Sequence, residues 1–256
     1  MYYLDTNTPM INYQMNVNSK IYVDKSLLIE KMNELLNTTS RYVCITRPRR
    51  FGKTINVSML GAYYTVGYDA QNLFKGLKIE KSDSFKKHLN KHHVIYIDFS
   101  RLPYPCEGFK DYIDFIQEQL FNDLAEAYGV KERKGYPIAD YFKLTNDRFI
   151  FLLDEWDSIF YEGFMSEEDK KNYLKFLKGL LKDQPYVELA FMTGVLPIAK
   201  YSAGSELNMF EEFSLPVIFY SSGVLLFIES LKEQFCKISE GIKRIIQEVA
   251  SVSLHI

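Results

Sequence analysis

The sequence reads Thr46-Arg47-Pro48-Arg49-Arg50-Phe51-Gly52-Lys53-Thr54 between an apolar run, 42–45, and a segment that can form a helix, 55–64. Phosphate-binding loops have the pattern G-x-x-x-x-G-K-[ST] after a strand and before a helix. Their backbone N–H groups surround a phosphate chain, the lysine reaches its far oxygens, and the hydroxyl binds Mg²⁺. Gly52, Lys53 and Thr54 keep this spacing, whereas Arg47 replaces the first glycine. The stretch therefore predicts a nucleotide site.

The alternative is a basic turn ahead of a solvated helix, because short motifs arise by chance. A second motif favours the nucleotide site. Residues 149–153 form a continuous apolar run, as expected for a strand buried on both faces of a parallel sheet, and Asp154 and Glu155 follow directly. Such an aspartate can hold a Mg²⁺ shell, and the adjacent glutamate can orient and deprotonate a water. The two motifs together predict a P-loop NTPase.

Two further apolar runs end in polar residues. Residues 94–97 lead into Asp98, a rival for the metal-binding aspartate. No carboxylate adjoins Asp98 to act on water, so its expected role is hydrogen bonding at the strand end. Residues 187–192 lead into Thr193, and in NTPases with an additional central strand a polar residue at this place senses the γ-phosphate. The alternative for Thr193 is a simple strand-terminal turn made with the following glycine.

Strands that alternate with helices predict an α/β fold, with a parallel sheet, helices on both faces and right-handed crossovers. Four core strands are recognisable. Helical spacing of apolar residues predicts helices over 27–36, over 109–124 with an end near a glycine, and from 167 to 181. Residues 21–23 have the pattern of a short strand. Residues 1–19 are polar and Asn-rich without clear periodicity, and we expect a lead-in arm there.

Composition narrows the class of protein. The chain has 256 residues, of which 47% are hydrophobic, so it can bury a substantial core. The net charge of -2 provides no overall attraction to nucleic acid or to an anionic membrane. The 3 cysteines lack the spacing of a zinc or dithiol site. No signal peptide or membrane span is recognisable, so we expect a cytoplasmic protein without a membrane partner.

Four short segments follow one another along the chain: YVDKSLLI at 22–29, the loop at 46–54, IYIDFS at 95–100 and LDEWD at 153–157. In this order they resemble the predicted AAA-ATPase-like family, which is related to archaeal-type ATPases whose loops also read R-R-x-G-K-[ST]. The resemblance covers about residues 20–214. Arg47 therefore looks like the loop form of that family.

The resemblance implies an AAA-type P-loop core that binds ATP with Mg²⁺. It assigns Lys53 to the phosphates, Thr54 and Asp154 to the metal, Glu155 to the attacking water and Thr193 to the sensor position. The rest of the loop is expected to line the nucleotide: Arg47, Pro48, Arg49, Arg50, Phe51 and Gly52. Similar proteins often carry a C-terminal nuclease-like domain of the PD-(D/E)xK kind, which this sequence is not expected to contain.

We expect three segments: an arm at 1–19, an AAA-like ATPase domain at 20–214 and a short helical tail at 215–256. In the tail, apolar residues recur at alternating steps of four and three, the spacing of packed helices. Two alternatives are open for this stripe. It can be buried against the core, or it can pair with a second copy and form a homo-oligomer.

The leading hypothesis for function is an AAA-like motor or switch driven by ATP hydrolysis, with an arginine finger supplied by another subunit. The alternative is a nucleotide-gated scaffold or adaptor without meaningful turnover. A small-molecule kinase is a third hypothesis, weakened by the adjacent Asp154 and Glu155. Arg49 and Arg50 can contact phosphates, contact DNA or pair with core acids, so a nuclease or DNA partner rests on local charge alone.

Overall fold

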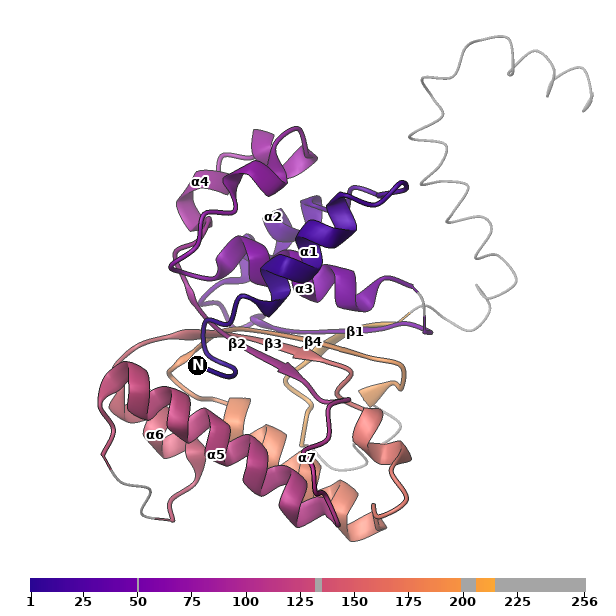
Figure 1. The fold of residues 1–256 in the computed structure, drawn as a ribbon, viewed down its shortest axis with the longest axis vertical. Coiled ribbons are helices and arrows are strands. Elements are labelled where there is room, and N and C mark those ends of the chain that lie inside the picture. The colour runs from indigo at the N-terminus through magenta and orange to yellow at the C-terminus, as the bar shows by residue number, and fades with distance from the viewer. Residues whose placement is uncertain (50, 132–134, 199–205, 215–256) are drawn as a thin grey trace, which may run out of the picture. The chain divides into compact units, whose positions relative to one another are not determined.

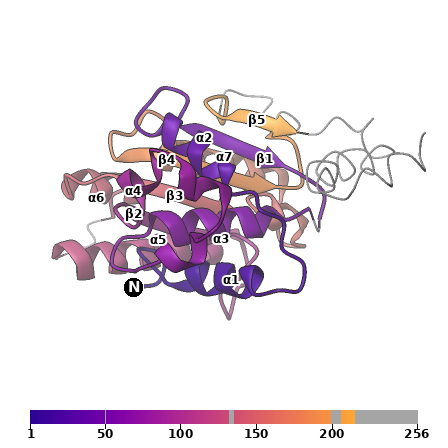
Figure 2. The ribbon, with the colours of Figure 1, turned by 90° about the horizontal axis from the view of Figure 1, so that it is seen from above.

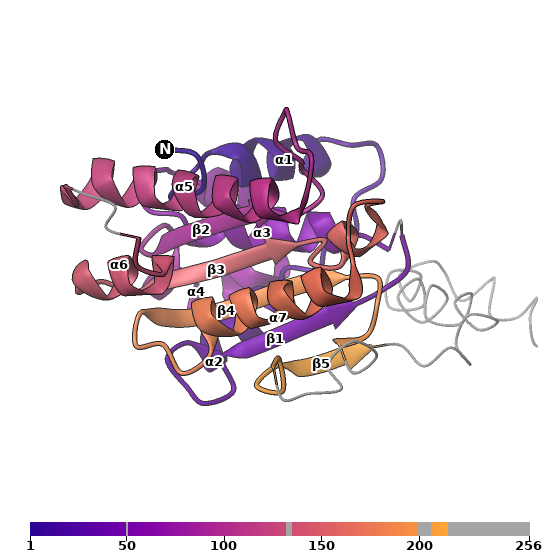
Figure 3. The same cartoon turned by 90° about the horizontal axis from the view of Figure 1, so that it is seen from below.

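The computed structural model describes residues 1–49, 51–131, 135–198 and 206–214. Its centre is a sheet of five parallel strands in the order β2-β3-β4-β1-β5, which Figure 3 shows from one face. The strands are β1 (Tyr42–Thr46), β2 (His93–Asp98), β3 (Phe149–Asp154), β4 (Val187–Gly194) and β5 (Glu211–Ser214). The predicted α/β class is confirmed, and the four expected strands all form.

Helices cover both faces of the sheet (Figure 1). One face carries α1 (Thr8–Val17), α2 (Leu27–Leu35), α3 (Lys53–Tyr64) and α4 (Phe85–His88). The other carries α5 (Phe109–Tyr128), α6 (Ile138–Leu144) and α7 (Glu167–Leu181). Three short 3₁₀ turns complete the described elements: η1 (Gln71–Phe74), η2 (Lys78–Lys81) and η3 (Ser158–Tyr161).

The apolar runs become central strands because their side chains enter two separate cores. In β3 every residue is buried. Phe149, Phe151 and Leu153 join the core under α5, α6 and α7. Ile150 and Leu152 join the core under α1, α2 and α3. A strand covered on both faces has no need for polar residues, so the alternating pattern of a half-exposed strand is missing.

Local signals set the ends of two predicted helices. Gly129 follows α5 with φ 70°, a left-handed conformation that stops a helix without steric cost. Ser166 precedes α7 and forms a capping box with Asp169. The Ser166 hydroxyl accepts the Asp169 N–H at 3.1 Å, and the Asp169 carboxylate accepts the Ser166 N–H at 3.0 Å. Each bond satisfies a backbone donor that the first helical turn leaves free.

The structure differs from the sequence-based expectations at three places. The segment expected to be an arm contains α1, with Tyr13 fully buried, and lies in one compact unit that extends from residue 1 to 214. Residues 21–23 form no strand, and Ile21 is exposed. The strand β5 was not expected, because its sequence EEFS has no apolar run. Figure 2 shows β5 at the sheet edge beside β1.

Two expectations fall outside the described residues: the helical tail predicted over 215–256 and the loop residue Arg50. Within the described part of the chain, none of the helices is long and apolar enough to cross a membrane.

The N-terminal residues are held by one buried carboxylate. Asp123 of α5 is 3% exposed and accepts backbone N–H groups from Tyr2 at 2.5 Å, Tyr3 at 2.6 Å and Leu4 at 2.9 Å. Leu4 also forms an antiparallel bridge with Ile95 of β2. Tyr3 and Leu4 are therefore part of the core.

We predict that Asp123→Ala lowers the free energy of unfolding by about 2–4 kcal/mol, because three buried N–H groups lose a charged acceptor. Urea denaturation measures the change. Asp114→Ala is the matched control, since Asp114 lies on the same helix but pairs with Lys110 at the surface, and its loss should cost less than about 0.5 kcal/mol. Equal stability of the two variants would contradict a structural role for the N-terminal residues.

Candidate functional site

The predicted site residues meet at the carboxyl edge of the sheet. β4 pairs with β1 on one side and with β3 on the other. The registers place Thr193 beside Ile45, and Met192 beside Leu153. The loop after β1, the Asp154-Glu155 pair after β3 and Thr193 on β4 are therefore neighbours. Ligands of open α/β sheets bind at this edge.

The predicted phosphate loop ends in a glycine with left-handed backbone. Gly52 has φ 75° and directly precedes α3, whose first residue is Lys53. The Lys53 side chain is nearly buried, and its amino group donates to the carbonyl oxygens of Arg47 at 3.0 Å and Pro48 at 3.2 Å. Burial lowers the pKa of Lys53, while the carboxylates of Glu155 and Asp154 raise it. The Lys53 side chain thus extends from the start of α3 to the backbone at the beginning of the loop.

Arg47 explains how the loop can lack its first glycine. Its N–H donates to the carbonyl of Gly194 at 3.0 Å, which continues the pairing of β1 with β4. Its guanidinium donates to the carbonyl oxygens of Phe213 at 2.9 Å and Thr46 at 3.0 Å. Arg47 is not among the described residues with positive φ. No glycine is needed at a position with ordinary backbone, and the side chain ties β5 to the loop.

Asp154 is the centre of the site. It is 2% exposed, and its Oδ1 accepts hydrogen bonds from the Thr193 hydroxyl and from the Glu155 N–H. Burial raises the pKa of Asp154, while hydrogen bonds from the hydroxyls of Thr193 and Thr54 lower it. The loop threonine and the β4 threonine therefore both interact with one buried carboxylate.

Glu155 has an unusual backbone. Its φ is 51°, in the left-handed region that non-glycine residues seldom adopt. The side chain is partly exposed. Burial raises the pKa of Glu155, and the nearby carboxylates of Asp154 and Asp98 raise it further, against the opposing charges of Lys53 and Arg49. A carboxyl group with a raised pKa at the end of a buried strand is suited to accept a proton.

The remaining predicted residues differ in accessibility. Thr193 is fully buried, and its hydroxyl could donate to a phosphate only by giving up the bond to Asp154. Arg49 and Phe51 are exposed on the loop. Asp98 accepts hydrogen bonds from the N–H and the hydroxyl of Ser100 and from the Arg101 guanidinium, which is the strand-end bonding expected of it.

Two acidic residues near the site have no role assigned from the sequence. Glu212 of β5 accepts hydrogen bonds from the Thr46 hydroxyl at 3.0 Å and from the Ile198 N–H at 3.2 Å. Nothing in the sequence marks Glu212, because its strand has no apolar pattern. Asp157 is buried beside the end of β4. Its position within the phrase LDEWD was the available signal.

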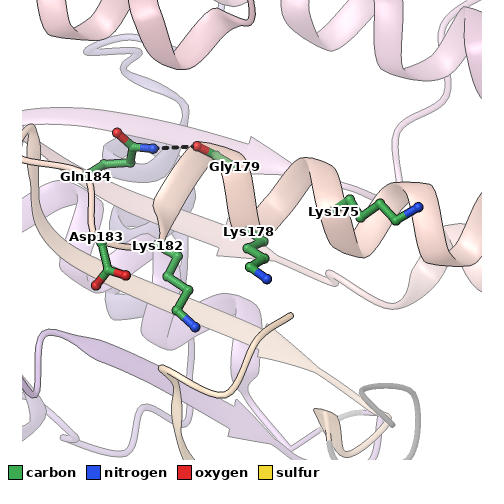
Figure 4. Close-up of a pocket in the computed structure, with 6 residues that line it drawn as sticks. All are labelled: Lys175, Lys178, Gly179, Lys182, Asp183 and Gln184. Atoms are coloured by element: carbon green, nitrogen blue, oxygen red, sulfur yellow. Dashed lines mark hydrogen bonds between the residues drawn. The ribbon is translucent and has the colours of Figure 1, made fainter. Parts of the chain in front are cut away.

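A shallow hollow lies elsewhere, beside the C-terminal end of α7 (Figure 4). Its lining includes Lys178, Lys182 and Gln184, and the Gln184 amide donates to the Gly179 carbonyl at 2.9 Å. The chain passes from here into the start of β4, so the hollow is at the amino edge of the sheet. It is separate from the site at the carboxyl edge.

We predict that Arg47→Gly, which restores the usual loop pattern, lowers the free energy of unfolding by about 1–3 kcal/mol. The variant loses the guanidinium bond to Phe213 of β5 and the one to Thr46, and it adds backbone freedom to the unfolded chain. Urea denaturation measures this, with Arg49→Gly as the control at an exposed loop position. A higher free energy of unfolding in Arg47→Gly than in the wild type would show that Arg47 does not stabilise this loop.

Comparison with known proteins identifies a family. A family model described as predicted AAA-ATPase matches residues 12–203. A search of curated proteins found no match. Among solved structures, the ORC2 protein of Aeropyrum pernix (ADPNP-ADP complexes) is similar at 13% identity and a TM-score of 0.38, over 85% of this chain and 55% of that one. This chain thus spans little more than half of that protein. The family match covers most of the sequence, and the chain belongs to the predicted AAA-ATPase family.

Proposed function

We propose that the protein binds ATP with Mg²⁺ at the carboxyl edge of the sheet and hydrolyses it as an AAA-like motor or switch. The observation that carries this proposal is the arrangement around Asp154. The hydroxyls of Thr54 and Thr193 both interact with this buried carboxylate, and Glu155 follows it directly. A phosphate loop, a strand-end aspartate and an adjacent glutamate are the parts that P-loop NTPases use for phosphoryl transfer to water.

The residues present fit a magnesium ion that arrives with a nucleotide. Within the described ranges, no group of three or more His, Cys, Asp or Glu side chains could hold a metal by itself. Mg²⁺ needs no such cage, because it is usually held by one or two protein oxygens together with phosphates and waters. Thr54 and Asp154 supply these oxygens. Held by these two residues, the ion would supply positive charge against the negative charge that develops during transfer.

The side chains of the chain have separable roles in this proposal. Lys53 carries the positive charge of the loop to the phosphate oxygens. Asp154 holds the metal shell, and its hydrogen bond from Thr193 fixes the orientation of the carboxylate. Glu155 orients a water and accepts its proton, a role that its raised pKa favours. Thr193 would act by orienting Asp154, and its hydroxyl would donate to a phosphate only after leaving Asp154.

A nucleotide-gated scaffold without turnover is the second candidate, and one observation favours it. Two arginines near the edge are engaged: Arg47 with the Phe213 carbonyl, and Arg101 with Asp98 at 3.0 Å. These bonds hold both guanidinium groups toward protein acceptors, so turning either group toward a transferred phosphate would weaken contacts that the structure already makes. Efficient hydrolysis would then depend on an arginine from another subunit or partner.

We predict that Lys53→Met weakens ATP binding about tenfold to a hundredfold, since charge-assisted bonds to phosphate are lost while methionine keeps the apolar stem. A fluorescent ATP analogue titrated in the presence of Mg²⁺ measures affinity, and thermal melting confirms folding. Lys171→Met, at an exposed position on α7, should bind as the wild type does. Unchanged affinity of folded Lys53→Met would remove the nucleotide-site assignment.

We predict that Glu155→Gln retains ATP but lowers kcat at least about a hundredfold, the scale of losing a general base. Phosphate release under saturating ATP measures turnover. Glu168→Gln is the control, because Glu168 is exposed in the first turn of α7. If the wild type binds ATP without releasing phosphate, the scaffold candidate replaces hydrolysis. If the wild type and Glu155→Gln turn over equally, Glu155 is not the base.

A further inference from the structure

Asp157 joins the segment after β3 to the segment after β4. It lies two residues beyond Glu155 and is 2% exposed. Its carboxylate accepts the N–H of Val195 at 3.0 Å and 3.1 Å, one distance for each oxygen, and the N–H of Leu196 at 2.7 Å. Both donors directly follow β4. One buried carboxylate therefore satisfies the first free backbone donors beyond the strand that carries Thr193.

Trp156 fits against the same strand end. Its backbone N–H donates to the Thr193 carbonyl at 3.0 Å, and its backbone carbonyl accepts the Tyr173 hydroxyl at 2.7 Å. A methyl group added to Gly194 would lie 2.4 Å from two atoms of the indole and 2.7 Å from Oδ1 of Asp157. Only a glycine allows this approach. The Trp156-Asp157 pair is thus packed directly on the backbone of β4.

These contacts hold Glu155 on both sides. On one side, Asp154 is bonded to the Thr193 hydroxyl. On the other side, the backbone N–H of Trp156 bonds the Thr193 carbonyl, and the Asp157 carboxylate accepts backbone N–H groups of residues 195 and 196. Glu155 lies between them with its left-handed backbone. Such a conformation persists when the surrounding structure determines it strongly, and it is common where a side chain must be aimed.

We propose that Asp157 is a positioning residue for Glu155, which acts by fixing the end of β4 to the chain just beyond the catalytic glutamate. The inference rests on the proposed ATP hydrolysis. Asp157 has no contact with the nucleotide in this account, since its carboxylate is turned to the backbone of Val195 and Leu196. Asp157 also places negative charge near Lys53, without a hydrogen bond to it. Its loss should therefore affect the aim of Glu155 more than the binding of phosphate by the loop.

Asp157→Asn is the test, because it replaces one acceptor oxygen by an NH₂ group that faces the N–H donors. We expect kcat to fall at least about tenfold with KM for ATP within about twofold of the wild type, since small misplacement of a catalytic group costs rate more than binding. Asp123→Asn is the matched control. Asp123 is 3% exposed and also accepts three backbone N–H bonds, but these come from residues 2–4. It should lose stability and keep kcat.

The comparison of the two variants separates positioning from general stability. A fall in kcat in Asp157→Asn alone, measured at a temperature where both variants are folded, supports the proposal. Wild-type kcat in Asp157→Asn, or an equal fall in both variants, overturns it. A rise in KM that accounts for the whole loss of kcat/KM also overturns it, because Asp157 would then serve ATP binding. If Asp157→Asn does not fold, Gly194→Ala disturbs the same contact from β4 and is judged by the same criteria.

A second readout keeps this inference separate from the proposed hydrolysis. Trp156 is the single tryptophan of the chain and lies between the two residues in question. Acrylamide quenching of its fluorescence, without nucleotide, should increase in Asp157→Asn and stay unchanged in Asp123→Asn. If the wild type shows no turnover, hydrolysis is rejected and quenching alone decides. Equal quenching of Asp157→Asn and wild type would then overturn the positioning role.

Discussion

Parallel pairing of β4 with β1 on one side and β3 on the other is the interaction on which the candidate site depends. Strands in a sheet lie about 4.8 Å apart, so this insertion separates the loop strand from the acidic strand by about 10 Å. β4 fills the interval with Thr193, whose hydroxyl bonds Asp154, and with Gly194, whose carbonyl accepts the Arg47 N–H. One strand end thus contacts both motifs, and a change in its register would separate them.

Three carboxyl groups lie near one another at this edge of the sheet, and their ionised forms repel one another. Asp98 and Asp154 each raise the pKa of Glu155, and Asp98 also raises that of Asp154, because ionised carboxylates repel one another. Lys53 and Arg49 oppose this effect on Glu155. A divalent cation would favour the ionised forms by the same electrostatics. These charges fit the proposed cation and phosphates, with the acids at the ends of β2 and β3 and the basic side chains on the loop.

Buried aspartates that accept backbone N–H groups recur in this fold. Asp123 holds residues 2–4 on α5, and Asp157 holds residues 195–196 at the end of β4. In both cases a carboxylate with several lone pairs satisfies donors that no strand or helix satisfies. The two residues differ in what they fix. Asp123 secures the beginning of the chain, whereas Asp157 secures backbone next to the proposed catalytic glutamate.

The sequence by itself determined the four long strands, because each apolar run is a segment that has to be buried. It also determined one end of α5 and one end of α7, because Gly129 and the Ser166 cap act through local contacts. It also predicted the site residues at Lys53, Asp154 and Glu155 by spacing; their roles remain proposals. Only the tertiary structure decided that β4 lies between β1 and β3, that Arg47 bonds β5, and that Asp157 is turned to Val195 and Leu196. These depend on pairing between segments far apart in the chain, which no local periodicity encodes. Likewise α1 and the polar strand β5 gain their stability from neighbours.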